Sequence, residues 1–98
     1  MLLETATITF PSPDCPQFQI GSAYLDERKK TFLETGKLIK ETLVKHPNGL
    51  VWVMCRIYAD EAAREEWWSD PIMTARSVLV RDYNTRNNIR VTTTVAPL

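Results

Sequence analysis

The sequence has few of the residues that build metal sites and nucleophilic sites. Among its 98 residues there is one histidine, His46, and there are two cysteines, Cys15 and Cys55, which do not form a Cys-x-x-Cys pair. It also has no phosphate-binding loop and no Gly-x-Gly-x-x-Gly fingerprint. We therefore expect no metal site and no bound cofactor, and no motif identifies catalytic residues.

An excess of charge of either sign is also missing. Lysine plus arginine number 12, as do aspartate plus glutamate, so the formal net charge is zero. A balanced chain lacks the electrostatic surface that binds nucleic acid or an anionic membrane, and no apolar run approaches the roughly 18 residues that span a bilayer. The start, MLLETATITF, has neither the basic nor the apolar segment of a signal peptide. We therefore expect a cytoplasmic protein with reduced thiols, and neither nucleic acid nor a membrane as partner.

The strands are predicted from alternation. A chain of this length can bury one hydrophobic core, so residues 1–98 are expected to form a single domain. Apolar and polar side chains alternate over residues 5–10 and 89–95, which predicts a strand at each end of the chain. The three prolines within residues 11–17 predict an irregular loop after the first strand.

Helices are predicted where the apolar period is near 3.6. Residues 22–35 form the first helix, and Gly36 is placed to end it in the left-handed conformation. Residues 60–88 are helical in two pieces, because Asp60 can cap the first and Asp70, followed by Pro71, can restart the second. The apolar stripe of the last helix is expected to comprise Ile72, Ala75, Leu79, Val80 and Tyr83.

Residues 37–60, KLIKETLVKHPNGLVWVMCRIYAD, fit either the end of a long helix or a β-hairpin. The glycine stop, the β-branched residues and Asn48-Gly49, which suits a type I′ turn, favour the hairpin. A two-residue loop would pair Lys45 with Trp52, Leu43 with Met54, Glu41 with Arg56 and Ile39 with Tyr58. A four-residue loop from His46 to Gly49, with Pro47 at its second position, is the alternative.

The resulting order, β-α-β-β-α-β, predicts a ferredoxin-like α+β fold: a four-stranded antiparallel sheet with two helices on one face. The helix side is expected to carry Ala6, Ile8, Phe10, Val51, Val53, Cys55 and Ile57. The other side is expected to carry Thr5, Thr7, Thr9, Ile39, Glu41, Leu43, Trp52, Met54, Arg56, Tyr58, Arg90, Thr92 and Thr94. A face this apolar needs a cover, and a second copy of the chain is the simplest one, so we expect a homodimer.

The stretch LVWVMCRIYADEAAREEWWSDP, in which a strand leads into a short aromatic-rich helix and then Asp-Pro, resembles the antibiotic-biosynthesis-monooxygenase-like members of the dimeric α+β barrel superfamily. The resemblance is one of pattern and extends from Tyr24 to Val95. It implies a dimer whose sheets pack face to face, with a pocket between each sheet and its helices or between the two sheets. The superfamily covers cofactor-free oxygenation of quinols and phenols, haem breakdown, lactone isomerisation, polyketide cyclisation and ligand sensing. The proline-rich loop departs from the simple pattern, and His46, placed in the predicted turn, supports neither a haem nor a histidine base.

The candidate ligand-binding residues share the predicted open face. They are Arg56, Tyr58, Trp52, Glu41, Thr7 and Thr9. In this interpretation Arg56 clamps an anion, Trp52 and Tyr58 form an aromatic wall, and the threonines are their neighbours. The plainer interpretation, which we favour, makes Glu41–Arg56 a cross-strand salt bridge inside a dimer interface.

The resemblance and these residues together favour a small dimeric protein that binds an aromatic or polyketide-like molecule in a pocket on the sheet. One alternative is a cofactor-independent monooxygenase or isomerase. The other is a non-catalytic structural or accessory subunit.

Overall fold

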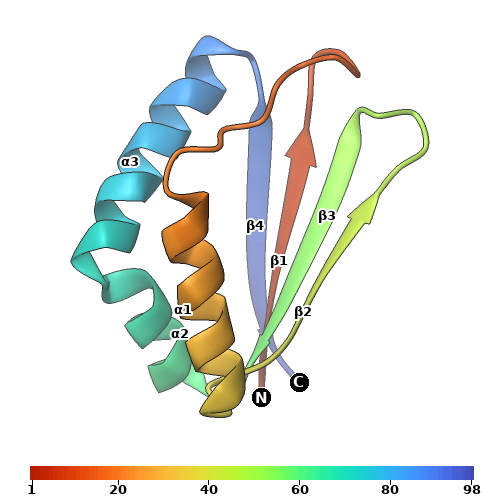
Figure 1. The fold of residues 1–98 in the computed structure, drawn as a ribbon. Helices are drawn as coiled ribbons and strands as arrows, with labels where there is room; N and C mark the ends of the chain where they lie inside the picture. Colours follow the sequence, from red (N-terminus) through yellow and green to blue (C-terminus); the bar gives the residue numbers. More distant parts are fainter.

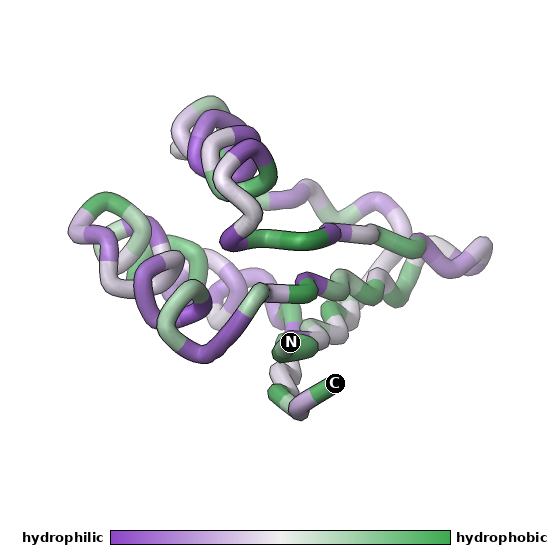
Figure 2. The backbone as a smooth tube through the Cα atoms, turned by 90° about the horizontal axis from the view of Figure 1, so that it is seen from below, coloured by the Kyte–Doolittle hydropathy of each residue, from purple (hydrophilic) through white to green (hydrophobic).

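Four strands carry the fold in the computed structural model, which describes all of residues 1–98. They are β1 (Leu2–Thr9), β2 (Leu38–Lys45), β3 (Val51–Tyr58) and β4 (Arg90–Pro97). They pair antiparallel in the order β2-β3-β1-β4. The helices α1 (Ser22–Glu34), α2 (Glu61–Ser69) and α3 (Pro71–Arg86) all lie on one side of this sheet (Figures 1 and 2). The predicted ferredoxin-like architecture is confirmed, and the second helix of the pattern is divided into α2 and α3, as expected.

The predicted caps set the helix ends. The Asp60 carboxylate accepts a hydrogen bond from the backbone N–H of Ala63, and Asp70 accepts two from the first turn of α3, where Pro71 takes the first helical position. Gly36 has a φ of 74° just after α1, as a glycine that ends a helix requires. These local signals are short-range, so the sequence alone identified them.

Residues 38–45 form a strand, as predicted, and not the continuation of a helix. The predicted pairs Lys45–Trp52, Leu43–Met54 and Glu41–Arg56 are all present. The fourth pair was wrong, because a β-bulge between Leu38 and Lys40 places Leu38 opposite Tyr58. Leu38 is consequently 1% exposed, whereas Ile39 is 48% exposed.

The hairpin turn runs from His46 to Gly49, as in the four-residue alternative, but the strand pairs beside it are those predicted for the two-residue loop. The Gly49 N–H donates to the His46 carbonyl at 3.0 Å, and the His46 N–H donates to the Val51 carbonyl at 2.9 Å. Gly49 has a φ of 72°, but Asn48 is not in the positive-φ region, so the type I′ turn is absent. The Asn48 side chain instead accepts a hydrogen bond from the Leu50 N–H.

The prediction of which β2 and β3 residues face the helices was wrong, since Glu41 and Leu43 of β2 also lie on the helix side. Residues directly opposite each other in a sheet share a face, and β1 pairs Ala6 with Met54 and Thr7 with Val53. Trp52, Met54 and Arg56 therefore face the helices together with Ala6. The face without helices instead carries threonines, valines and Cys55. We call it the open face, and its central residues are Thr5, Thr7, Thr9, Thr42, Val44, Val51, Val53, Cys55, Thr92 and Thr94.

The buried core lies where α1, α2 and the ends of β2 and β3 meet. Its members are Phe32, Leu38, Tyr58, Ala63, Trp67 and Met73. The predicted stripe of α3 was largely wrong, since Ile72 and Leu79 are half exposed. The inward residues are Met73, Arg76, Val80 and Asn84, whose spacing is equally helical. Two sets of residues in α3 thus have the spacing of a helix face, and only tertiary packing decides which set points inward.

Gly49→Ala should destabilise the protein more than Gly36→Ala. Both glycines have positive φ, so alanine costs each about 1 kcal/mol of backbone strain. A Cβ at Gly49 would also lie 3.0 Å from the Pro13 Cβ, whereas a Cβ at Gly36 meets nothing within 4 Å. Urea unfolding of both variants measures the difference, and equal losses would show that the Pro13 contact relaxes freely.

Candidate functional site

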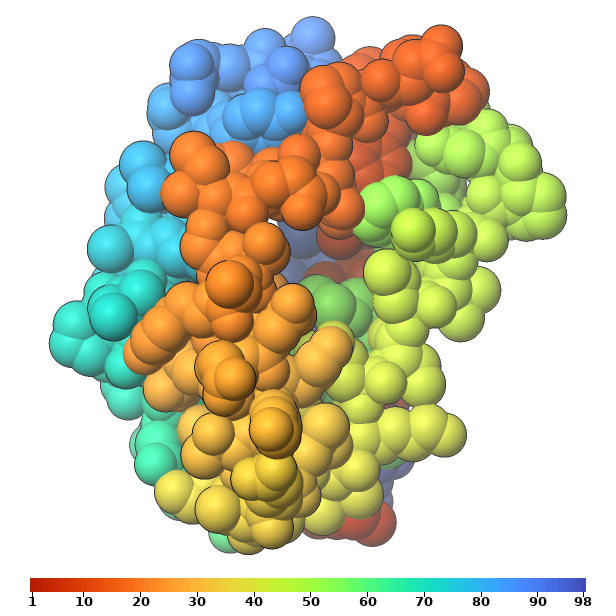
Figure 3. Space-filling model, in the orientation of Figure 1, coloured from red at the N-terminus to blue at the C-terminus, as the bar shows by residue number.

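A cavity of about 270 Å³ lies between the helix-facing side of the sheet and helices α1 and α3. Of its 18 lining residues, 11 are hydrophobic. Its mouth is visible as a hollow between the β2–β3 hairpin and the segment that precedes α1 (Figure 3). The chain thus has an apolar cavity with a few polar groups, which is the usual composition of a small-molecule site.

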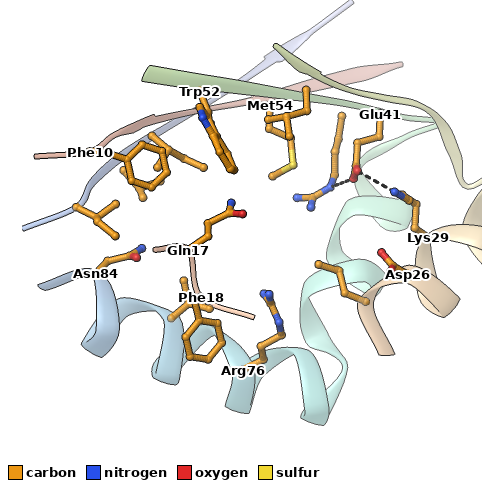
Figure 4. A pocket seen from close by; sticks show the side chains of 18 residues that line it. Phe10, Gln17, Phe18, Asp26, Lys29, Glu41, Trp52, Met54, Arg76 and Asn84 are labelled. Atoms are coloured by element: carbon orange, nitrogen blue, oxygen red, sulfur yellow. Dashed lines mark hydrogen bonds and ion pairs between the residues drawn. The ribbon is translucent and has the colours of Figure 1, made fainter. Parts of the chain in front are cut away.

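The sheet forms an apolar floor. Phe10 and Trp52 meet edge to face with ring centroids 5.1 Å apart, and Met54 lies beside them (Figure 4). The Lys45 ammonium lies 4.2 Å from the Trp52 ring centroid, which is the predicted cation–indole pair. Trp52 is therefore fixed from two sides while part of its ring remains on the cavity.

The segment 11–21 forms one wall, and Gln17 and Phe18 project from it toward the cavity (Figure 4). Its contacts to α3 include two hydrogen bonds from side chains to backbone carbonyls. Tyr83 Oη donates to the Pro16 carbonyl at 2.6 Å, and Arg76 Nε donates to the Ile20 carbonyl at 3.1 Å. The Phe18 and Tyr83 rings also pack at 5.5 Å. The proline-rich loop that departs from the simple fold pattern is thus part of the site.

A row of alternating charges crosses three strands at one end of the cavity. Glu4 on β1 and Glu41 on β2 are both in register with Arg56 on β3. Arg56 Nε donates to Glu41 Oε2 at 2.7 Å, and Arg56 Nη1 forms an ion pair with Glu4 Oε1 at 3.6 Å. Lys29 from α1 holds the other oxygen of Glu41 at 3.3 Å (Figure 4).

Glu4 is the most completely satisfied group in this row. Its carboxylate accepts hydrogen bonds from Tyr58 Oη at 3.0 Å, Arg64 Nε at 2.9 Å and Trp68 Nε1 at 3.0 Å. Glu4 is 3% exposed and Arg56 is 6% exposed. A buried charge needs such partners, because its desolvation is otherwise very unfavourable.

Tyr58 lies behind this row and does not line the cavity. Its side chain is fully buried. Burial raises the pKa of the Tyr58 phenol, and the neighbouring Glu4 carboxylate raises it further. The phenol is therefore neutral at physiological pH and acts as a hydrogen-bond donor to Glu4, so it does not serve as an acid for a ligand.

The structure separates the six predicted site residues into groups. Trp52, Glu41 and Arg56 line the cavity, on the helix side of the sheet. Thr7 and Thr9 lie on the open face, so their expected position beside Arg56 was wrong. The alternation within each strand was correct, but the register between β1 and β3 was not predicted.

Arg76 is one of several cavity residues that sequence reasoning missed, together with Gln17, Phe18, Lys29 and Asn84. It projects from α3 toward the cavity (Figure 4), and no carboxylate lies within ion-pair distance of it. Burial, together with the nearby charge of Arg56, lowers the pKa of the Arg76 guanidinium. Its spacing of three and four residues from Met73 and Val80 was the available signal.

Other kinds of site are not evident. No group of three or more histidine, cysteine, aspartate or glutamate side chains is placed to hold a metal ion. Both cysteines are free, and His46 is exposed in the hairpin turn. None of the helices is long and apolar enough to cross a membrane.

No protein-family model and no curated protein matches the sequence. Solved structures do share its architecture. Rv0793 from Mycobacterium tuberculosis has a TM-score of 0.65 at 22% identity, over 100% of this chain and 96% of that one. SnoaB, a cofactor-independent oxygenase from Streptomyces nogalater, has a TM-score of 0.63 at 11% identity, over 99% and 91% of the two chains. A dimeric ferredoxin-like protein from an uncultured marine organism has a TM-score of 0.64 at 14% identity, over 100% and 94%.

The fold is that of antibiotic biosynthesis monooxygenase-like structures. The resemblance expected from the strand and aromatic helix is therefore confirmed at the level of the fold. Identities of this size carry no activity to this chain, so function must be argued from the cavity itself.

Glu4→Gln should destabilise the protein by about 3 kcal/mol, because Arg56 and Arg64 lose a shared charged partner. Glu65→Gln is the matched control: Glu65 is exposed and forms no ion pair, so its loss should stay within about 0.5 kcal/mol. Chemical denaturation of both variants measures the two losses. A Glu4→Gln loss as small as that of the control would contradict the assigned role of this row.

Proposed function

We propose that this protein binds a small, largely apolar molecule, such as an aromatic or polyketide-like ring compound, in the cavity between the sheet and the helices. The observation that carries the proposal is the cavity itself, with its floor of Phe10, Trp52 and Met54 and its few polar groups at the edges. Its volume of about 270 Å³ is close to the lower limit of roughly 300 Å³ for ligand pockets. The ligand is therefore small, on the scale of one or two rings.

Cofactor-independent oxygenation or isomerisation is the second candidate. It is favoured by the fold shared with the oxygenase SnoaB and by Glu41, a carboxylate on the cavity that could accept a proton from an acidic C–H or O–H group. Both oxygens of Glu41 are already engaged, however, one by Arg56 at 2.7 Å and the other by Lys29 at 3.3 Å. No carboxylate oxygen is left free of a protein partner to face a ligand, so binding without chemistry is the better supported function.

The binding proposal can be tested with para-ethylbenzyl alcohol, an uncharged one-ring probe. Titration should change the tryptophan fluorescence of the wild type and of Trp67→Phe, because Trp67 is buried in the core away from the cavity. The response should be largely lost in Trp52→Phe. A response that survives loss of Trp52 and disappears with Trp67 would move the site away from the sheet floor.

We also propose that the protein is a homodimer whose subunits meet through the open face. That face carries no helix, and its β-branched side chains include Val44, which is 65% exposed. Trp52 and Met54, which were expected on the open face, point toward the helices instead. The proposed dimer seam, where the two open faces meet, would therefore consist mainly of threonines and valines. β-Branched residues suit the packing of one sheet on another, and one structure with the same fold is described as dimeric.

Val53→Glu should convert the dimer to a monomer, because it buries an unpaired charge at the centre of the seam. Val78→Glu, on the exposed side of α3, is the matched control and should leave the dimer intact. Sedimentation equilibrium of the wild type and both variants measures this. A wild type that is monomeric at micromolar concentrations would contradict the proposal and favour a different protein as the cover of this face.

A further inference from the structure

We propose that the molecule bound in this cavity is a carboxylate, whose anionic group is held by Arg76 with Arg56 beside it and whose apolar ring lies on the sheet floor. The inference rests on the proposed function and specifies the chemical class of the ligand. It follows from the orientation of Arg76, from the charges that line the cavity, and from the apolar surface next to them.

Several protein groups hold the Arg76 side chain in place, and none of them is an anion. Its Nε donates to the Ile20 carbonyl, its guanidinium carbon lies 5.5 Å from the Phe18 ring centroid, and a Cβ added at Gly21 would lie 3.2 Å from its Cδ. Its two terminal nitrogens make no hydrogen bond and no ion pair with the protein. A guanidinium fixed through Nε with both Nη atoms free presents the planar fork that binds a carboxylate in a bidentate manner.

The charges that line the cavity do not balance around Arg76. The cations are Lys29, Arg56 and Arg76, and the carboxylates are Asp26 and Glu41. Glu41 is already shared by Lys29 and Arg56. Asp26 is exposed and pairs with none of the three cations. One positive charge on a half-buried side chain is therefore left without a counter-charge, which an anionic ligand would supply.

Arg56 contributes to the same anion site from the opposite wall. Its Nε and Nη1 are used by Glu41 and Glu4, which leaves Nη2 without a partner in the protein. The proximity of the two arginines is unfavourable, since the charge of Arg56 acts on Arg76. A carboxylate placed between them would reverse that repulsion and would gain from the reduced dielectric of a cavity with apolar walls.

The rest of the ligand is expected to be a ring. Arg76 lies one helical turn from Val80 on α3, across the cavity from Met54 and Trp52 on β3 (Figure 4). A carboxylate at Arg76 thus directs its substituent toward this apolar floor. A phosphate monoester fits less well, because its greater charge would face Glu41 and Asp26 across a small space.

The test compares para-ethylbenzoate with the uncharged, nearly isosteric para-ethylbenzyl alcohol by isothermal titration calorimetry. We expect the wild type to bind the benzoate about tenfold or more tightly than the alcohol. Arg76→Met should abolish this preference, so that the variant binds the benzoate no more tightly than it binds the alcohol. Arg76→Lys, which keeps the charge but loses the fork, should retain part of it. Arg81→Met removes an exposed cation with no ion pair from the same helix and should keep the full preference.

The possible outcomes separate the two proposals. If the wild type binds the alcohol as tightly as the benzoate, or if Arg76→Met keeps the preference, the carboxylate inference is overturned while ligand binding in the cavity stands. If neither compound binds, both proposals fail. If Arg76→Met loses affinity for the alcohol as strongly as for the benzoate, Arg76 serves only to anchor segment 11–21, and the inference is again overturned.

Discussion

The row Glu4–Arg56–Glu41 is the constraint on which the sheet depends. Arg56 enters a nearly dry environment, where an unpaired charge would be very unfavourable. Its two carboxylate partners come from the strands on either side and stand in register with it. A shift of one residue in either pairing would move a carboxylate to the other face and leave the arginine alone. The row therefore sets the register of β1, β2 and β3 together.

The same arginine also positions the helical layer. Its guanidinium carbon lies 5.0 Å from the Trp67 ring centroid and 5.8 Å from that of Trp68, two adjacent residues of α2. Trp67 is buried in the core, and Trp68 donates its indole N–H to Glu4. Adjacent residues on a helix point in different directions, so the pair places α2 both against the core and over the charged row.

Sequence reasoning succeeded where the controlling interaction was local. Gly36, Asp60 and Asp70 end or begin helices through contacts within a few residues, and the turn before Val51 brings Glu41 to Arg56. It failed on the relation between β1 and β3, because those strands are joined by a long connection that includes β2 and because β3 is apolar on both faces. Glu4, the single charge in β1, was the signal that could have fixed the register and thus the face.

The inward-facing side of α3 was also predicted wrongly, and this error hid Arg76, which lies on the cavity. The row through Ile72 and Leu79 is more apolar than the row through Arg76 and Asn84, so hydrophobicity alone chooses the wrong side of the helix. The polar row faces inward because the space beneath it is a cavity rather than packed core. A helix that turns an arginine and an asparagine toward the interior departs from the usual pattern, and such departures tend to mark functional sites.

The two faces of the sheet differ in composition because β3 alternates between them. Val53 and Cys55 belong to the open face, whereas Met54 and Arg56 belong to the cavity and the charged row. The cavity opens on the helix side, between the hairpin and segment 11–21 (Figure 3), so a dimer formed through the open face would not cover its mouth. Entry of a ligand would then involve segment 11–21, whose side-chain hydrogen bonds to α3 come from Tyr83 and Arg76. Because Arg76 also presents the free guanidinium, the residue that fixes this wall is the one best placed to respond to what the cavity holds.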